Sequence, residues 1–254
     1  MRSAPDNSSA RLRLGYRAMR LAGRLGWAEP ELRGLPSLVR TGDAVIDIGA
    51  AHGMYTVPLA CLVGVGGRVD AFEPHPRQQR TLRWWRRVLS APQVTVKASA
   101  AGRQSGDLTM RLPIVLGLPI YGRAHLTDGA AERLPGARVR HWSTPTTSVD
   151  DWVDEQQIER VSFIKADVEG FEPQVIEGAT RTIDRDRPSL LLEIEDRHLA
   201  RYGNEAAEVI ADIARRWPEY RMYTWRDETW TLTESVTLAA RNYLFATDEA
   251  LART

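Results

Sequence analysis

The chain is poor in cysteine, and Cys61 is the single one among its 254 residues. One thiol cannot form an intramolecular disulfide, so the fold depends on its core and a reducing cytoplasm is permitted. Long apolar runs are also absent, since no stretch approaches the roughly 20 residues of a membrane span. Residues 1–10 are polar and lack the apolar segment of a secretion signal. We therefore expect a cytoplasmic protein without a membrane span.

Neither sign of charge dominates. The 34 Lys and Arg residues are balanced by 33 Asp and Glu, which leaves a net charge of +1, so bulk electrostatics gives no reason to expect a nucleic-acid partner. Arginine is nevertheless concentrated in residues 11–27 and 77–89, whose periodicity predicts two basic helices. We expect these helices either to contact a membrane surface or polyanion, or to be ordinary solvated helix faces.

The sequence is 43% hydrophobic and 26% charged, which is typical of a globular domain. Along the chain, apolar segments typical of strands alternate with helical patterns. The predicted strands span residues 44–47, 69–73, 94–98, 161–166, 189–194, 220–225 and 242–246. This alternation, closed by a hairpin, predicts an α/β fold with a doubly wound, mostly parallel, seven-stranded sheet and an antiparallel edge strand.

The chain divides into an extension and one domain. Residues 1–40 are predicted to form an N-terminal helical extension, and residues 41–254 a single domain. Within the domain, residues 113–145 are rich in Pro, Gly and Arg and show no clear periodicity. Because long irregular segments in compact domains are usually functional or disordered, we expect this one to cap a binding pocket.

The first predicted strand runs into a glycine turn and then a helical pattern, a junction typical of cofactor sites. Gly49 carries no Cβ, so the backbone there can approach a ligand closely. A dinucleotide fingerprint would need glycines in place of Ala51 and Met54, which disfavours NAD. Instead, acids end the first two strands, Asp47 and Glu73, and carboxylates suit the ribose and the cationic amino-acid end of S-adenosylmethionine (SAM). The alternative is a structural turn that binds no ligand.

Five runs along the chain carry a family resemblance. They are residues 47–56 (DIGAAHGMYT), 72–74 (FEP), 164–173 (IKADVEGFEP), 190–194 (LLLEI) and 242–245 (NYLF). Together they resemble the FkbM family of class I methyltransferases, which usually has Asn where this chain has Ala51. The resemblance implies a Rossmann-like methyltransferase fold and methyl transfer from SAM.

The carboxyl ends of parallel strands meet at one edge of a sheet, so the polar residues there should share a crevice. On the cofactor side we expect SAM to be bound by Asp47, Gly49, Ala51, Tyr55, Glu73, Pro74 and Ser99.

On the acceptor side, Asp167 follows the fourth predicted strand, Glu193 lies near the end of the fifth, and His198 lies just beyond it. Asp167 is placed to take a proton from an acceptor hydroxyl. The three residues together, completed by water, are also expected to form a Mg²⁺ site. The alternative for Asp167 is a purely structural cap on the following helix.

These residues and the resemblance imply a SAM-dependent O-methyltransferase that acts on a hydroxyl of a natural product or a sugar, as in secondary-metabolite biosynthesis. The predicted partner is a small-molecule or glycosyl acceptor. One alternative is an N-methyltransferase on a small molecule, because a neutral amine needs no strong base. Another is a non-catalytic binding module that keeps the SAM fold.

Overall fold

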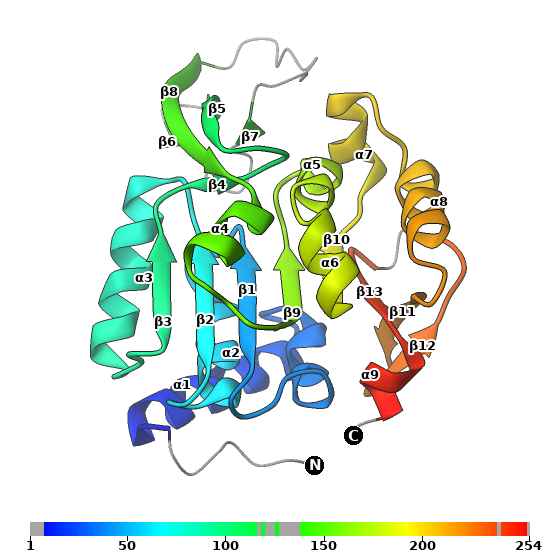
Figure 1. Cartoon of the computed structure of the whole chain (residues 1–254). Helices are drawn as coiled ribbons and strands as arrows, with labels where there is room; N and C mark the ends of the chain where they lie inside the picture. Colours follow the sequence, from blue (N-terminus) through cyan, green and yellow to red (C-terminus); the bar gives the residue numbers. More distant parts are fainter. Residues whose placement is uncertain (1–7, 116–117, 120–124, 127–137, 238–239, 253–254) are drawn as a thin grey trace.

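The computed structural model describes residues 8–115, 118–119, 125–126, 138–237 and 240–252, and its centre is an eight-stranded sheet (Figure 1). In spatial order, the strands are β12 (Thr229–Leu232), β11 (Arg221–Arg226), β13 (Asn242–Ala246), β10 (Ser189–Glu193), β9 (Val161–Ala166), β1 (Ala44–Ile48), β2 (Arg68–Phe72) and β3 (Val94–Lys97). The five strands from β10 to β3 are parallel, whereas β13 is antiparallel to both β10 and β11. The predicted α/β fold with a mostly parallel sheet is confirmed.

The sheet has one strand more than the seven predicted. Residues 229–232 pair with β11 as β12, and Trp230 lies opposite Trp225. The antiparallel strand β13 lies inside the sheet because it pairs with both β10 and β11, and the hairpin of β11 and β12 forms the edge. β12 has only four residues, and a sequence this short does not show enough periodicity to distinguish a strand from a connecting loop.

Helices cover both faces of the sheet. One layer contains α1 (Ala10–Arg24), α2 (Thr56–Val63) and α3 (Pro76–Val88), and the other contains α4 (Val149–Glu155), α5 (Glu172–Glu177), α6 (Thr180–Asp186) and α8 (Ala206–Arg216). Short helices α7 (Asp196–Leu199) and α9 (Asp248–Ala252) and 3₁₀ turns at Pro30–Arg33, Leu35–Ser37 and Ala200–Tyr202 complete the described chain. No helix in the described ranges is long and apolar enough to cross a membrane.

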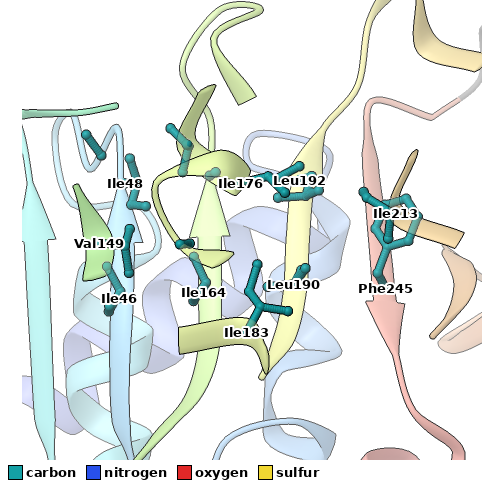
Figure 2. Close-up of a cluster of buried hydrophobic side chains, with 14 of the residues drawn as sticks. Ile46, Ile48, Val149, Ile164, Ile176, Ile183, Leu190, Leu192, Ile213 and Phe245 are labelled. Carbon is teal, nitrogen blue, oxygen red and sulfur yellow. The ribbon is translucent and has the colours of Figure 1, made fainter. Parts of the chain in front are cut away.

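Successive side chains of each central strand point to opposite faces of the sheet, and apolar side chains on both faces pack against the two helix layers. Ile46, Ile164 and Leu190 belong to the cluster beneath α4, α5 and α6, part of which Figure 2 shows. Their neighbours Val45 and Leu191 point the other way, into the cluster with α1 and α2. Strands buried on both faces have nearly continuous apolar sequences, which is why these strands were predictable.

A smaller sheet lies beyond the carboxyl ends of the parallel strands (Figure 1). It contains β4 (Ala100–Ala101), β5 (Gly106–Val115), β6 (Leu118–Pro119), β7 (His125–Leu126) and β8 (Arg138–Thr147). β5 and β8 pair antiparallel, with Met110 opposite Trp142. The segment 113–145, predicted to be irregular, therefore includes the ends of two long strands, which pair with each other. Its residues 116–117, 120–124 and 127–137 lie outside the described residues.

Helix α1 buries only part of its apolar surface. Leu12 and Tyr16 are buried against α2, whereas Leu14, Leu21 and Leu25 are 68%, 55% and 52% exposed. The outward face of α1 is thus both basic and apolar. Contact of this helix with a membrane surface or polyanion stays a prediction.

Candidate active site

A cavity of about 290 Å³ lies at the carboxyl ends of β1, β2, β9 and β10. The chain runs outward from β1 to β2 and β3 and then returns to β9 on the other side of β1. Open α/β sheets bind their ligands at such a switch point, and the volume is close to the lower end of the about 300–1,000 Å³ typical of ligand pockets. One side of the wall includes Gly49, Ala51, Glu73 and Pro74, the other includes Asp167, Glu169 and Glu193, and β5 and β7 contribute Met110 and Leu126.

Gly49 brings the ends of two strands together at the cavity. Its φ is +78°, and a Cβ at this position would lie 1.9 Å from the carbonyl oxygen of Asp167. The Asp167 amide donates a hydrogen bond to the Ile48 carbonyl at 3.0 Å, and the Gly49 amide donates to the Phe72 carbonyl at 3.1 Å. The glycine is therefore required by the contact between β1 and β9, whether or not a ligand lies nearby.

Glu73 is fixed in the wall by backbone amides. One carboxylate oxygen accepts a hydrogen bond from Ala51 at 2.8 Å and the other accepts one from His75 at 2.7 Å. Burial raises the pKa of Glu73 to about 7. Each oxygen keeps a second lone pair, so Glu73 can still accept a hydrogen bond from a ligand hydroxyl in the cavity.

We predict that Glu73→Ala weakens SAM binding by about tenfold to a hundredfold, because a hydrogen bond to a charged group contributes roughly 1.5–3 kcal/mol. Titration calorimetry of the folded variant measures the change. The control is Glu219→Ala, which removes a carboxylate paired with Arg187. If the folded Glu73 variant binds SAM as tightly as the parent, the assignment of Glu73 to the ribose is wrong.

Three residues predicted to bind the cofactor lie behind the cavity wall. Asp47 is 1% exposed and accepts a hydrogen bond at 2.5 Å from a threonine hydroxyl of α2, and burial raises its pKa to about 6. The Tyr55 hydroxyl donates to Glu29 at 2.5 Å. The Ser99 hydroxyl lies 3.0 Å from the Pro145 carbonyl. These side chains support the wall from behind, and Tyr55 positions Glu29, which does line the cavity.

Behind Asp167 lies a buried lysine. Lys165 is 1% exposed, and its Nζ donates to the Asn242 side chain at 2.8 Å and lies 3.6 Å from the Asp167 carboxylate. Asn242 in turn donates to Glu29 at 2.8 Å. Burial lowers the pKa of Lys165, but Asp167, Glu29 and Glu193 together raise it to a net value above the usual one. Lys165 is therefore a fixed positive charge that orients Asp167 at the cavity.

The structure brings two of the three predicted metal ligands together, Glu193 and His198, and adds Glu169 to them. Asp167 pairs with Lys165 instead. Burial raises the pKa of Glu169 to about 7 and also raises that of Glu193. Burial lowers the pKa of His198, but the two glutamates raise it to a net value above the usual one. A Mg²⁺ site formed by Asp167, Glu193 and His198 stays a prediction, whereas the ligand atoms that the structure places within reach of one ion are those of Glu169, Glu193 and His198.

Two residues important to the wall escape the sequence prediction. Glu29 lies on the connection between α1 and β1, where no motif marks it. Lys165 does leave a signal, because it is a charged residue between Ile164 and Ala166 in a mostly apolar strand. A charge in such a position needs a buried partner, and that rule would have connected it with Asp167.

The buried Glu31, near this network, predicts a pH-dependent stability. Burial raises its pKa from the usual 4.5 to about 7. The folded state therefore holds a proton that the unfolded state has lost, so stability falls as the pH rises from about 4.5 to about 7. Glu31→Gln should remove this loss. The change that the variant makes in the free energy of unfolding should therefore be more favourable at pH 8 than near pH 4, by on the order of 2–3 kcal/mol.

Urea unfolding of parent and Glu31→Gln protein across this pH range measures the difference. Glu177→Gln, at an exposed glutamate paired with Arg103, serves as the control. A difference between Glu31→Gln and the parent that does not change with pH would contradict the prediction.

The sequence model of the methyltransferase FkbM domain matches residues 47–217, which include both sides of the cavity. The chain belongs to the FkbM methyltransferase family. This is a family of SAM-dependent methyltransferases. No curated protein matches the chain.

Solved structures of methyltransferases are similar to this FkbM-family chain. Methyltransferase FkbM from Methylobacillus flagellatus KT is 19% identical with a TM-score of 0.50, over 91% of this chain and 54% of that one, so this chain spans about half the length of that protein. Aeropyrum pernix fibrillarin, with natively bound SAM, is 17% identical with a TM-score of 0.45 over 91% and 75% of the two chains. A SAM-dependent O-methyltransferase from Thermotoga maritima is 14% identical with a TM-score of 0.45 over 86% and 64%.

The cavity of this FkbM-family protein fits SAM chemically. Five carboxylates line it, those of Glu29, Glu73, Asp167, Glu169 and Glu193, and Glu193 has a buried oxygen without a hydrogen bond from any described residue. Buried acids need compensation by positive charge, and SAM carries an ammonium and a sulfonium group. Ala51 has φ +46°, a left-handed conformation that Asn, the family's usual residue there, adopts more readily.

Proposed function

We propose that this protein is a SAM-dependent O-methyltransferase whose acceptor is a hydroxyl group of a natural product or a sugar. The observation that carries the proposal is a cavity with two acidic sides. Glu73 follows β2, whereas Asp167 and Glu169 follow β9. An alcohol is a weak nucleophile that must lose its proton as its oxygen is methylated. A side rich in proton acceptors, opposite the residues assigned to the cofactor, supplies what that reaction needs.

Each part of the cavity has a role in this proposal. SAM supplies a methyl group on a cationic sulfur, and Glu73 holds its ribose. Asp167 accepts the proton of the hydroxyl, and Lys165, 3.6 Å away, keeps the carboxylate in place. Met110 and Leu126, from the smaller sheet, cover the cavity with apolar surface and help to exclude water, which strengthens these electrostatic interactions.

Transfer of a labelled methyl group tests the proposal. The protein is incubated with SAM that carries a ¹³C-methyl group and with pairs of glycosides or natural-product alcohols and their amino analogues, and products are analysed by mass spectrometry. We expect the label on oxygen. Transfer to the amine of each pair and never to the hydroxyl would contradict O-methylation and favour the N-methyltransferase alternative. SAM binding without transfer to any acceptor would favour the binding module.

The two alternatives also predict different variants. An amine is nucleophilic once neutral, so an N-methyltransferase would tolerate Asp167→Asn far better than an O-methyltransferase. A binding module would keep its affinity for SAM and show no turnover to lose.

A further inference from the structure

Three side chains from separate parts of the chain lie close together beside the cavity. Glu169 lies in the turn between β9 and α5, Glu193 ends β10, and His198 lies in α7. His198 Nε2 is 3.2 Å from Glu169 Oε2, and His198 Nδ1 is 3.4 Å from Glu193 Oε2. One ligand atom from each residue lies within 4.8 Å of the other two. A single ion at metal–ligand distances of about 2.0–2.6 Å can reach atoms so spaced.

The cluster is buried and its atoms are unsatisfied. Glu193 is 7% exposed and His198 is 9% exposed. Glu193 Oε2, His198 Nδ1 and Glu169 Oε2 are all inaccessible, and within the described chain none of them makes a hydrogen bond. Buried polar atoms are almost always hydrogen-bonded. Glu193 Oε2 and His198 Nδ1 lie 3.4 Å apart, and Glu169 Oε2 adds a third exception in the same cluster, which points to a ligand that the three residues share.

A protonated His198 that bridges the two glutamates is the rival explanation. Imidazole N–H groups donate in the plane of the ring, and hydrogen bonds weaken steeply away from a straight line. Both contacts are close, yet neither the Glu169 nor the Glu193 oxygen satisfies the hydrogen-bond geometry. A metal ion instead requires one ligand atom from each residue within its reach, and such atoms of Glu169, Glu193 and His198 lie within 4.8 Å of one another.

We propose that Glu169, Glu193 and His198 bind one divalent first-row transition-metal ion. Mg²⁺ prefers a shell made only of oxygen, and the imidazole nitrogen moves the preference towards ions that accept nitrogen and oxygen together. The carboxylates of Glu169 and Glu193 would balance the double positive charge of such an ion. Asp167 is not a ligand, because it pairs with Lys165.

The position of the site also suggests its use. Glu169 and Glu193 line the cavity, so the open coordination positions of the ion would face the acceptor. A coordinated hydroxyl has a lowered pKa, which would let the neighbouring Asp167 take its proton. This use rests on the proposed function, whereas binding of the ion does not.

Binding of Mn²⁺ tests the site directly. Protein treated with chelator and then dialysed is titrated with MnCl₂, and the free ion is followed by electron paramagnetic resonance. We expect one tightly bound Mn²⁺ per chain and a higher Tm with Mn²⁺ present. Glu193→Gln and His198→Gln should each lower the affinity by at least about 100-fold, since even loss of an outer partner of a metal ligand costs about 10–100-fold.

Glu195→Gln is the matched control, because Glu195 is close in sequence but pairs with Arg241 at 3.2 Å; its Mn²⁺ affinity should equal that of the parent. If the two buried variants fail to fold, Glu169→Gln, at a partly exposed side chain, should give the same loss. Absence of stoichiometric Mn²⁺ binding to the folded parent, or parental affinity in His198→Gln or Glu169→Gln, would overturn the proposal. Methyl transfer by metal-free protein would then leave the proposed function intact.

Discussion

Gly49→Ala is expected to lower the affinity for SAM by more than about a hundredfold, a loss of at least about 2.7 kcal/mol. The added Cβ would lie 1.9 Å from the Asp167 carbonyl oxygen and 2.9 Å from its carbonyl carbon. Both contacts are with backbone, so no side chain can move aside to relieve them. β1 and β9 must separate at the point where their ends form the two sides of the cavity, which displaces Asp167 together with the glycine turn.

A second glycine separates this clash from simple backbone strain. Gly42 also has a positive φ, +90°, but a Cβ there would meet nothing within 4 Å. Gly42→Ala therefore carries the same conformational penalty, typically about 1 kcal/mol or somewhat more, without the steric conflict. Calorimetry with SAM and circular dichroism on both variants give the comparison. Equal affinities in the two variants would show that the Gly49 junction does not shape the cofactor site.

Asp167→Ala is expected to lower turnover by a factor of about 10²–10⁴, the usual contribution of a general base, while SAM affinity changes little. Asp167 lines the cavity on the side opposite Glu73. Its carboxylate is held 3.6 Å from the buried Lys165, which keeps it oriented. The variant leaves Lys165 its hydrogen bond to Asn242, so the lysine stays anchored.

Turnover is measured with an acceptor found in the labelling experiment, and SAM affinity by calorimetry. Asp167→Asn separates charge from shape, because it keeps the size of the side chain and should lose turnover to a similar extent. Asp154→Ala, at an exposed residue paired with Arg181, is the control. Full turnover in Asp167→Ala, or loss of SAM binding instead of turnover, would refute the acceptor-side role and leave Asp167 a structural residue of the turn.

Most of the fold was predictable because its signals are local. β1, β9 and β10 are mostly apolar in sequence because both of their faces are buried, and a glycine turn after β1 marks the first βα junction. The short strand β12 and the arginine-rich β8 were not predictable, because their pairing partners, and not their own periodicity, make them strands.

The sequence by itself determined the class of fold, the family, and the edge of the sheet at which acids gather, because strand periodicity and turn glycines act over a few residues. Only the tertiary structure decided which atoms face the cavity. Glu29 reaches it from a distant connection, and Asp47 turns behind the wall. Glu169 has φ +58° and lies next to His198 because the backbones of their two turns are in contact. The contact is at Gly170, where a Cβ would lie only 2.2 Å from the His198 carbonyl oxygen. Side-chain direction depends on such dihedral angles and on contacts between remote elements, which no local pattern encodes.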